Sequence, residues 1–577
     1  MTGTTETGYC VPSAERITVT NLDDSGVGVV LYPQVIEVDY LRKGVWKPGT
    51  IAEHLHTVAL EWPERPALVS ESGTLTFAEL DAVTDRRAAG LVELGLPVGG
   101  RVLLQLHNRP STVVAWYALL KAGLVPVCTL PIHRHHEISE IGRQAAAIAH
   151  LVPADNPKFD LVEFALAESA GSDRERMIIT CEGERGAGTV SFDDLGSEVD
   201  PALARQMITS IQEAMGPQSV AAYQLSGGTT GIPKVIPCLQ ASYWTYATDF
   251  AAAREWTCET RVSYAGPIVH NAGIVIGLHG PHSVGAALVL GSPTLDSLFW
   301  TLTDGRATDA FVGPFAYEAV HDRRMGDAKH LKRALFSGTK VSEDHFRALE
   351  ARGIWAGQVF GMGEGLCATT PLNYPRSARL AGVGVPISEF DEIRIFYPGT
   401  EDEVGPEEVG ELCARGPYTI RGYLNAPDHN RDAFTADGFY RSGDLVCERI
   451  IDGVRCLTIE GRIKDMISRG GEKISTAEVE LLLMSHPDID EAVLVPVPDV
   501  RLGERACAFL TGPAGEVSLE EVRRHLDSLG VAKYKWPEHL VWLDALPRAT
   551  EIGKIDRRLL RRQAAESVVT GATSAGD

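Results

Sequence analysis

The sequence lacks the features expected of a protein that binds membranes or nucleic acid. Its net charge is −23, and so large an acidic excess disfavours nucleic acid or an anionic membrane as a partner. One long stretch, from Val262 to Leu295, carries no Asp, Glu, Lys or Arg, but its prolines, histidines and glycines suit a lipid-exposed helix badly. We therefore expect buried strands and pocket lining in this stretch.

Paired cysteines are also absent. The ten cysteines are scattered and form no C-x-x-C pair, which predicts reduced thiols in a cytoplasmic protein. The first residues, from Met1 to Gly8, have neither the basic nor the apolar region of a signal peptide. The chain also has no internal repeat.

The composition is that of a globular protein with several domains. Hydrophobic residues make up 44% and charged residues 23% of the 577 residues. The pattern along the first half alternates between helix and strand. Thr76 and Glu79 form a capping box that begins a helix, residues 102–106 predict a buried strand, 110–123 a helix and 125–129 another strand. Such alternation predicts parallel sheets covered by helices.

Changes in this pattern divide the chain. Short strand signals at 392–396, 410–414 and 419–423 predict a β-rich lobe, and helices at 476–484 and after Ser518 indicate a compact α+β domain. The predicted fold class is α/β, with a large N-terminal domain of helix-covered parallel sheets, a small β-rich lobe and a small mobile α+β C-terminal domain. The expected boundaries are an N-terminal extension at 1–35, the large domain at 36–390, its β-rich lobe at 391–464, the C-terminal domain at 465–563 and a disordered tail at 564–577.

The run from Tyr223 to Lys234 is the strongest chemical signal. It holds three glycines, a serine, two threonines and a lysine. Glycines let backbone N–H groups approach an anion, the hydroxyls add donors, and the lysine adds a positive charge, so the run predicts a polyphosphate-binding loop. It lacks the Walker A spacing. A linker is the alternative, but the apolar flanks favour an ordered loop between strands.

Two further segments place acids beside glycines. Glu364 lies in a glycine-rich run, and a carboxylate beside a phosphate site is repulsive unless a cation bridges them, which predicts Mg²⁺. An exposed turn glutamate is the alternative. Asp444 follows a tight turn and could accept hydrogen bonds from a ribose, although this signal alone is weak.

The last segments lie at a domain boundary and near the C-terminus. Residues 461–465 and 469–474 combine basic residues, an acid and a glycine turn, which is compatible with a hinge and a mobile loop. Lys554 follows Gly553, and such a lysine could reach an active site, although alone it is more typical of a solvated surface.

The order and spacing of these segments resemble the core motifs of the adenylate-forming superfamily, which includes acyl-CoA synthetases, adenylation domains and luciferases. The resemblance covers roughly residues 50–560. Within the superfamily the chain is most similar to the aryl-acid AMP ligases, which activate 2,3-dihydroxybenzoate or salicylate. The segments that carry this likeness are Gln224–Gly228, His270–Asn271, Gln358–Met362, Gly416–Tyr423 and Ser468–Lys473.

The resemblance implies ATP and Mg²⁺ as cofactors and assigns roles to residues. It implies catalytic roles for Lys554, Glu364 and His270, with Glu364 as the Mg²⁺ ligand. The implied ATP-binding residues are Ser226, Gly227, Gly228, Thr229, Thr230, Lys234, Gly338, Thr339, Val359, Phe360, Gly361, Asp444 and Arg462. The implied contacts of the aromatic acid are Asn271, Ala272, Ser337, Gly338, Met362, Gly363, Cys367 and Lys554, with Asn271 binding the hydroxyl ortho to the carboxylate.

The resemblance also implies a two-step cycle. Lys554 would bridge the substrate carboxylate and the α-phosphate, where two anions must approach each other. The C-terminal domain would then rotate about Asp465, remove Lys554 and admit an acceptor. The expected acceptor is the pantetheine thiol of a separate carrier protein, in siderophore or antibiotic biosynthesis, because the chain has no carrier domain of its own. Coenzyme A and a small-molecule amine or hydroxyl are the alternatives.

Departures from the subfamily concern the substrate pocket. Ala272 stands where a bulky aromatic is usual, Gly363 where alanine is common, and Cys367 where valine or leucine is common. These small side chains predict a pocket for a ring with a further substituent, such as 2,3-dihydroxybenzoate or 3-hydroxyanthranilate. The region 274–289 is also about four residues longer than in the subfamily, and this insertion could refill the space.

Three other functions share parts of this pattern. A general acyl-CoA ligase is one, but an apolar chain would leave the amide of Asn271 unpaired. A degenerate nucleotide-binding protein is disfavoured because Lys554, Glu364 and Asp444 are all present. A luciferase-like oxygenase has the same core motifs and is distinguished only by oxygen consumption.

Overall fold

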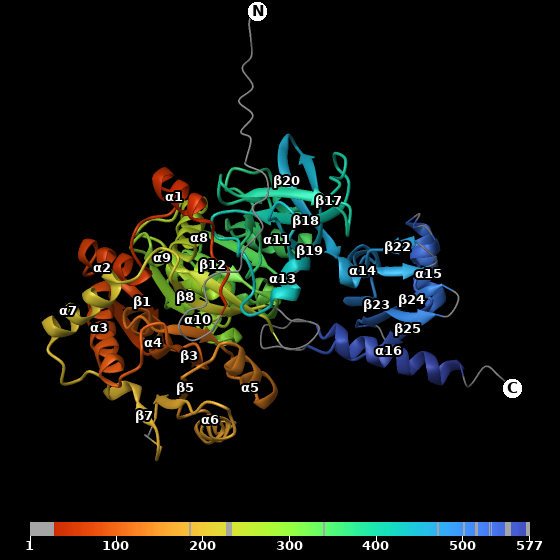
Figure 1. The fold of residues 1–577 in the computed structure, drawn as a ribbon. Coiled ribbons are helices and arrows are strands. Elements are labelled where there is room, and N and C mark those ends of the chain that lie inside the picture. The colour runs from red at the N-terminus through yellow and green to blue at the C-terminus, as the bar shows by residue number, and fades with distance from the viewer. Residues whose placement is uncertain are drawn as a thin grey trace, which may run out of the picture.

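The protein is described by a computed structural model, in which the described residues form four sheets with helices packed on them (Figure 1). The structure describes residues 28–157, 159–183, 186–226, 233–338, 341–469, 472–499, 502–513, 517–529, 531, 533–548 and 555–572. The mixture of largely parallel, helix-covered sheets confirms the predicted α/β class.

A seven-stranded sheet in the order β7-β6-β5-β3-β4-β8-β9 forms one layer of the large domain. All its pairs are parallel except the last, in which β8 and β9 run antiparallel, so the glycine-rich run joins two neighbouring strands. The strands are β3 (Arg101–Leu104), β4 (Val125–Cys128), β5 (Ala149–Pro153), β6 (Met177–Cys181), β7 (Val190–Ser191), β8 (Val220–Leu225) and β9 (Val235–Leu239).

A nine-stranded sheet in the order β16-β15-β14-β13-β12-β10-β11-β1-β2 forms the second layer. Its six central strands are parallel, and both edges are antiparallel. The strands are β1 (Pro66–Ser70), β2 (Gly73–Thr76), β10 (Arg261–Tyr264), β11 (Ala287–Leu290), β12 (Asp309–Val312), β13 (Arg333–Ser337), β14 (Trp355–Gly361), β15 (Cys367–Thr369) and β16 (Val385–Pro386).

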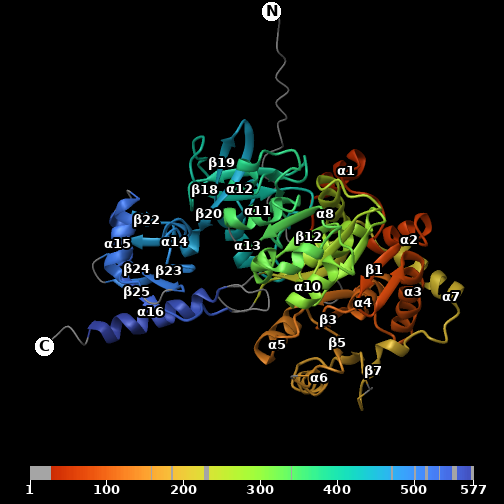
Figure 2. The same cartoon turned by 180° about the vertical axis from the view of Figure 1, so that it is seen from behind.

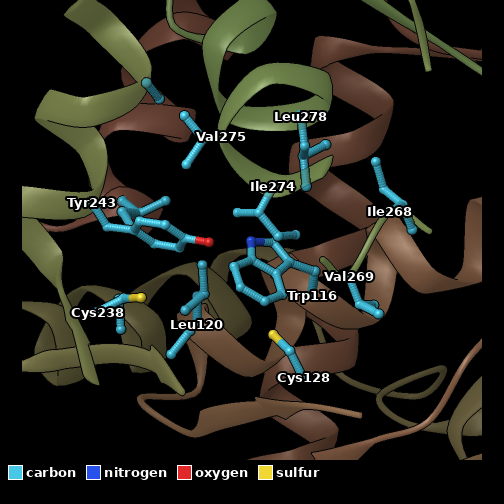
Figure 3. Packing of buried hydrophobic residues seen from close by; sticks show 14 of the residues in the cluster. Trp116, Leu120, Cys128, Cys238, Tyr243, Ile268, Val269, Ile274, Val275 and Leu278 are labelled. Atoms are coloured by element: carbon cyan, nitrogen blue, oxygen red, sulfur yellow. The ribbon is translucent and has the colours of Figure 1, made fainter. Parts of the chain in front are cut away.

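Helices cover these sheets and share one core with them. The capping box predicted at Thr76 and Glu79 is present at the start of its helix. Figure 3 shows Trp116, Tyr243 and Ile274 meeting in this core, and all three are nearly inaccessible to solvent. The helices are α1 (Gln34–Lys43), α2 (Ile51–Glu61), α3 (Phe77–Glu93), α4 (Pro110–Lys121), α5 (His135–Gln144), α6 (Leu161–Ala170), α7 (Pro201–Glu213), α8 (Gln240–Ala253), α10 (Leu295–Leu302), α11 (Glu343–Glu350), α12 (Arg376–Ala381) and α13 (Pro427–Ala433).

The stretch from Val262 to Leu295 is only partly as predicted. Its ends contribute the expected buried strands β10 and β11, but its middle is a wide-turn helix, η2 (Gly273–His279), continued by α9 (Gly280–His282). Every residue of η2 is buried, so its hydrophobic pattern has no period that distinguishes a helix from a strand. None of the described helices has both the length and the apolar character needed to cross a bilayer.

A four-stranded antiparallel sheet forms the β-rich lobe. Its strands are β17 (Glu392–Phe396), β18 (Gly410–Arg415), β19 (Tyr440–Ile451) and β20 (Val454–Arg462). The strand predicted at Thr419–Tyr423 is wrong, because these residues form turns and irregular backbone between β18 and α13. The backbone of this segment is hydrogen-bonded to distant parts of the chain instead of to a neighbouring strand.

The C-terminal part packs beside this lobe (Figures 1 and 2), where the Ser475 hydroxyl donates to the Glu460 carbonyl at 2.8 Å. The tail predicted to be disordered from residue 564 is instead helical to Ala572, because it continues the last helix of the domain. The elements are β21 (Ile467–Arg469), β22 (Glu472–Ile474), α14 (Thr476–Met484), β23 (Glu491–Asp499), β24 (Gly503–Thr511), α15 (Leu519–Ser528), β25 (His539–Trp542) and α16 (Arg557–Ala572).

Candidate active site

The glycine-rich run begins and ends at a closed stem. The Ser226 N–H donates to the Lys234 carbonyl at 2.9 Å, and the Lys234 N–H donates to the Ser226 hydroxyl at 3.0 Å. The stem therefore holds the two ends of the loop at one place beyond β8 and β9. The loop residues expected to contact phosphate lie outside the described residues: Gly227, Gly228, Thr229 and Thr230.

Tyr423 joins this loop to the expected metal ligand. The Lys234 ammonium lies 5.5 Å from the centre of the Tyr423 ring, within the range of a cation–π contact. The Tyr423 hydroxyl donates to Glu364 Oε1 at 2.6 Å and lies 2.8 Å from the hydroxyl of Tyr440. Burial and the Glu364 carboxylate both raise the pKa of Tyr423, so this hydroxyl stays a proton donor at neutral pH.

A glycine next to Glu364 allows this arrangement. Gly365 has φ +106°, a conformation that favours glycine, and a Cβ atom there would lie 1.9 Å from the Tyr418 carbonyl oxygen. The backbone of Gly416–Tyr423 can therefore pass directly over the turn that carries Glu364.

We call Gly416–Tyr423 the strap. Its Ile420 N–H donates to the Glu364 carbonyl at 2.9 Å. The Trp46 indole N–H donates to the Pro417 carbonyl at 2.8 Å. Because its backbone groups are satisfied by distant segments rather than by a neighbouring strand, the apolar–polar alternation of the strap does not produce a β-strand.

The expected ribose site is an ion pair across two strands. Asp444 and Arg462 are partners in the β19–β20 register, and Arg462 Nε donates to Asp444 Oδ1 at 2.6 Å. Asp444 is buried, whereas the Arg462 side chain is 43% exposed. The Ser442 hydroxyl accepts from the Asp444 N–H at 3.0 Å and fixes the turn. The structure thus holds the Asp444 carboxylate in an orientation in which a ligand hydroxyl could compete with Arg462 for it.

The other ATP-binding candidates lie at the carboxyl ends of two parallel neighbours, β13 and β14. Ser337 pairs with Val359 in register, so the residues after them meet at one sheet edge. Gly338 has φ +106° at the turn that leaves β13. Phe360 and Gly361 complete β14 at the same edge. Thr339 lies outside the described residues.

A pocket enclosing about 400 Å³, including its open mouth, lies between α8, the strap and the Glu364 turn. Asn271 and Gly363 line it, as the resemblance implied for the acid. Tyr246 and Tyr418 also line it, and their rings stack at 4.4 Å with an interplanar angle of 8°. A flat aromatic surface of this kind suits a planar ring.

Asn271 carries the clearest sign of a missing partner. The residue is 8% exposed, and its Oδ1 is buried with no hydrogen-bond partner among the residues that the structure describes. A buried carbonyl oxygen without a partner is costly, and a ligand donor would remove that cost. The side chain is therefore suited to accept from a hydroxyl or amino group of a bound molecule.

Three other residues that the resemblance assigned to the aromatic acid lie outside the pocket. Ala272, Met362 and Cys367 do not line this pocket and pack in the surrounding apolar core. The small side chains of Ala272 and Cys367 therefore do not enlarge the pocket that Asn271 and Gly363 line. Burial raises the pKa of the Cys367 thiol, which keeps it uncharged.

Asn108 positions the loop before Asn271 and was missed by the sequence prediction. Its amide donates to the Gly266 and Gly291 carbonyls, and its Oδ1 accepts from the Ile268 N–H at 2.8 Å. His270, expected to be catalytic, lies on the turn that this amide supports. Its position in the short loop between the buried strand β3 and α4 is the signal that could have identified Asn108.

Asp391 lies behind the tyrosine stack. The Tyr418 hydroxyl donates to Asp391 Oδ2 at 2.6 Å, and Asp391 Oδ1 is buried without a hydrogen-bond partner in the described part of the chain. Burial, together with the nearby carboxylate of Asp249, raises the pKa of Asp391 to about 8. Burial likewise raises the pKa of Asp249 to about 6. A carboxyl that titrates near neutral pH therefore supports one wall of the pocket.

The predicted hinge residue is fixed by the last helix. Arg561 of α16 donates to Asp465 Oδ1 at 2.8 Å. The contact between Ser475 and Glu460 crosses the same junction. Lys554, the expected catalytic lysine, lies outside the described residues, so its role stays a prediction.

Comparisons with known families and proteins agree with this geometry. A family described as AMP-binding enzyme matches residues 55–424, and a family described as AMP-binding enzyme C-terminal domain matches 478–554. The chain is 36% identical to Triostin synthetase I of Streptomyces triostinicus, over 94% of this chain and 99% of that protein. It is 34% identical to a 2,3-dihydroxybenzoate-AMP ligase of Bacillus subtilis (94% and 99%) and 36% identical to a Salicyl-AMP ligase / salicyl-S-ArCP synthetase of Mycobacterium tuberculosis (94% and 95%).

Solved structures give the same result. The apo structure of MbtA from Mycobacterium smegmatis is 33% identical and matches with a TM-score of 0.68 over 93% of this chain and 98% of that one. The anthranilate CoA ligase AuaEII in complex with anthranoyl-AMP matches with a TM-score of 0.75 over 90% and 98%, at 20% identity, which supports the fold alone.

Proposed function

The chain belongs to the family of AMP-binding enzymes, and we propose that it joins an aromatic carboxylic acid to AMP. In this reaction a carboxylate oxygen of the acid attacks the α-phosphorus of ATP. The bond from that phosphorus to the bridging oxygen of the leaving group breaks, and aryl-AMP and pyrophosphate form. The acid is of the 2-hydroxy- or 2-aminobenzoate type, which includes salicylate, 2,3-dihydroxybenzoate and 3-hydroxyanthranilate.

The unpaired Oδ1 of Asn271 carries this proposal. It lies in a pocket that the stacked pair Tyr246 and Tyr418 also lines, and these groups suit a planar ring that carries a hydrogen-bond donor. An ortho hydroxyl or amino group on the ring would supply the donor. A simple fatty acid would bury the same oxygen without a partner, which disfavours it. The names of the two AMP ligase relatives support the same class of acid.

ATP would lie between the closed loop stem and the edge of β13 and β14. The Lys234 ammonium would face its phosphates, and Asp444 would accept from the ribose hydroxyls in place of part of its bond to Arg462. Aromatic and backbone groups at the ends of the two strands would contact the base. In this arrangement each described candidate would face the part of ATP that its chemistry suits.

The chemistry of the site fits Mg²⁺. Glu364 is a carboxylate oriented by a hydroxyl donor at one oxygen, and oxygen ligands are those that Mg²⁺ prefers. When bound, the ion would neutralise phosphate charge. The protein's own part is to hold Glu364 through Tyr423, which also faces Lys234. Lys554 would add a second positive charge at the reacting carboxylate.

The acyl group would then pass to a thiol acceptor. We assign this role to the pantetheine thiol of a separate carrier protein, with coenzyme A or a small-molecule amine or hydroxyl as alternatives. The thiol sulfur would attack the acyl carbon, the acyl–phosphate bond would break, and AMP would leave with its electron pair. Rotation about Asp465 would open the site to the acceptor, which requires the Arg561 contact to break.

Pyrophosphate release tests the first step. The full chain is mixed with ATP, Mg²⁺ and, in turn, salicylate, 2,3-dihydroxybenzoate, 3-hydroxyanthranilate and unsubstituted benzoate. We expect turnover with the ortho-substituted acids and little with benzoate, because benzoate offers Asn271 no donor. A preference for 3-substituted rings would further support a pocket larger than salicylate needs, and a strict preference for bare salicylate would refute that size.

If no aromatic acid gave pyrophosphate release, the aryl-acid proposal would be overturned and a general acyl-CoA ligase would be favoured. The product of the second step separates the acceptors, because a carrier-bound thioester, an aryl-CoA and an amide or ester differ in mass. Oxygen consumption during turnover would instead indicate a luciferase-like reaction.

A further inference from the structure

A cluster of metal-ligating side chains lies outside the site described above. It consists of Glu318 and His321 on η3 (Pro314–His321) and His345 on α11, and ligand atoms of all three lie within 4.8 Å of one another. We propose that this cluster binds one divalent transition-metal ion of the zinc class, with Asp344 as a fourth ligand. We call it the η3–α11 cluster.

The local structure of η3 brings two of the ligands together. Glu318 and His321 are three residues apart on a 3₁₀-helix, where side chains at this spacing lie one above the other. The sequence spacing Glu-x-x-His therefore becomes a pair of donors on one face. In an α-helix the same spacing would turn them partly apart.

His345 is oriented from the other side. It stands in the first turn of α11, whose N-cap is Ser342, and its Nδ1 is hydrogen-bonded to the Ser342 hydroxyl. This directs Nε2 toward Glu318, whose Oε1 lies 3.1 Å from it, so a metal ion would replace the contact between the two side chains. A hydrogen bond to the second ring nitrogen is the usual way in which proteins fix a metal-binding imidazole.

A fourth donor is already in reach. His321 Nε2 lies 3.4 Å from Asp344 Oδ2, and the rings of His321 and His345 are 5.2 Å apart. The His345 side chain is 12% exposed, whereas Glu318 and Asp344 are 84% and 67% exposed. The imidazole of His345 is thus held in place, and the two carboxylates are exposed enough to turn toward an ion, although Asp344 would have to loosen its 3.5 Å ion pair with Arg347.

The donor set selects the metal. Two imidazoles and carboxylate oxygens suit zinc and its neighbours, whereas Mg²⁺ and Ca²⁺ prefer oxygen alone. Zinc takes four ligands in a tetrahedral arrangement with Zn–N distances of about 2.0–2.1 Å. Two imidazoles and two carboxylates complete such a site.

The position of the cluster gives it a structural consequence. The hydroxyl of Tyr317, on η3, donates to the Ser337 carbonyl at 2.9 Å, and a Cβ atom on Gly338 would lie 3.1 Å from the ring of Pro314. η3 therefore contacts the end of β13, while α11 follows the same connection. An ion shared by the two helices would tie together both sides of the turn expected to hold the base of ATP.

Zinc binding to the full chain tests the proposal. Metal-free protein is placed in a buffer with excess Mg²⁺, which fills oxygen-only sites. Zn²⁺ is then added as the only titrant, and calorimetry measures its binding. We expect one equivalent of tight binding to the wild type, and binding weaker by about tenfold or more in the variants His321→Ala and His345→Ala. His330→Ala removes an exposed histidine outside the cluster and serves as the matched control, which should bind as the wild type does.

Thermal unfolding gives a second measurement that does not depend on calorimetric stoichiometry. Zn²⁺ should raise Tm of the wild type and of His330→Ala, but not of the double variant His321→Ala/His345→Ala, because the ion binds only the folded cluster. Circular dichroism checks that the double variant is folded. Unchanged Zn²⁺ binding in the double variant, or no binding by the wild type, would overturn the proposal.

Discussion

Two groups of buried polar side chains in the large domain differ in how completely they are paired. Lys121 is inaccessible to solvent, and its ammonium donates to the Asp81 carbonyl and carboxylate and to the Asp85 carboxylate at 2.5–2.9 Å. In the pocket region, Asn271 Oδ1 and Asp391 Oδ1 are buried with no hydrogen-bond partner among the described residues. Complete pairing joins α3 to α4 and serves stability, whereas the unpaired atoms lie in the pocket, for Asn271, and behind its tyrosine wall, for Asp391.

The largest effect is expected at the paired group. Lys121→Met leaves Asp81 and Asp85 as buried carboxylates without their main partner, and the free energy of unfolding should fall by about 3–5 kcal/mol. Urea denaturation measures the change. Lys43→Met removes an exposed lysine paired with Asp39 and is the control, with no measurable loss expected. If Lys121→Met lost no more stability than Lys43→Met, the pairing of the buried Lys121 would not stabilise the fold as inferred from its contacts.

The second effect depends on pH. The pKa of Asp391 is raised to about 8, so between about pH 4 and pH 8 the folded state binds a proton that the unfolded state has lost. The free energy of unfolding should therefore fall as pH rises through this range, by up to about 1.4 kcal/mol per pH unit. Asp391→Asn should remove this fall, so the variant gains stability relative to the wild type as pH rises.

Denaturant unfolding at several pH values checks this prediction. Asp249, with a pKa raised to about 6, should add its own slope below pH 6, and Asp249→Asn separates the two contributions. Parallel pH profiles for the wild type and Asp391→Asn would contradict the assignment.

The third effect falls on specificity. Asn271→Leu removes the unpaired acceptor, so kcat/KM for an ortho-hydroxy acid should fall about 10- to 100-fold, which is about 1–3 kcal/mol. Turnover of benzoate should change little, because benzoate offers no donor. The free energy of unfolding should stay equal or rise, in contrast to the loss at Lys121. An unchanged ratio of ortho-substituted to unsubstituted acid would refute the role of Asn271.

The smallest effect is expected at Tyr423. Tyr423→Phe keeps the ring beneath Lys234 but removes the donor to Glu364, so the Mg²⁺ concentration for half-maximal activity should rise a few-fold, about 1 kcal/mol. Pyrophosphate release across a Mg²⁺ series measures it. Tyr440→Phe leaves the bond from Tyr423 to Glu364 in place and should have a weaker effect. Identical Mg²⁺ curves for wild type and Tyr423→Phe would contradict the positioning role.

Local signals in the sequence predicted much of the fold. The capping box at Thr76 and the helix Thr476–Met484 lie where expected, because both depend on residues within one turn of each other. The strand Glu392–Phe396 was also predicted to the residue. The residues of the candidate site were predicted in the same way, since glycine and acid spacing around Lys234, Glu364 and Asp444 is local, and their roles stay a prediction.

The rest depends on contacts between distant segments. The strap was predicted as a strand, but its backbone bonds to groups near residues 46 and 364 instead of to a neighbouring strand. Asn108 holds a loop more than 150 residues away, and no short pattern indicates that. The wide-turn helix η2 is buried on every side and therefore shows no period.

The strap has a consequence for the kinetics of the two substrates. Its Tyr418 lines the pocket expected for the acid, its Tyr423 lies against Lys234 of the phosphate loop, and the residue after it, Leu424, donates its N–H to the Val235 carbonyl at 3.0 Å. One short piece of backbone thus contacts both binding sites. We expect ATP and the acid to bind with synergy, each changing the affinity of the other by the same factor, as thermodynamic linkage requires.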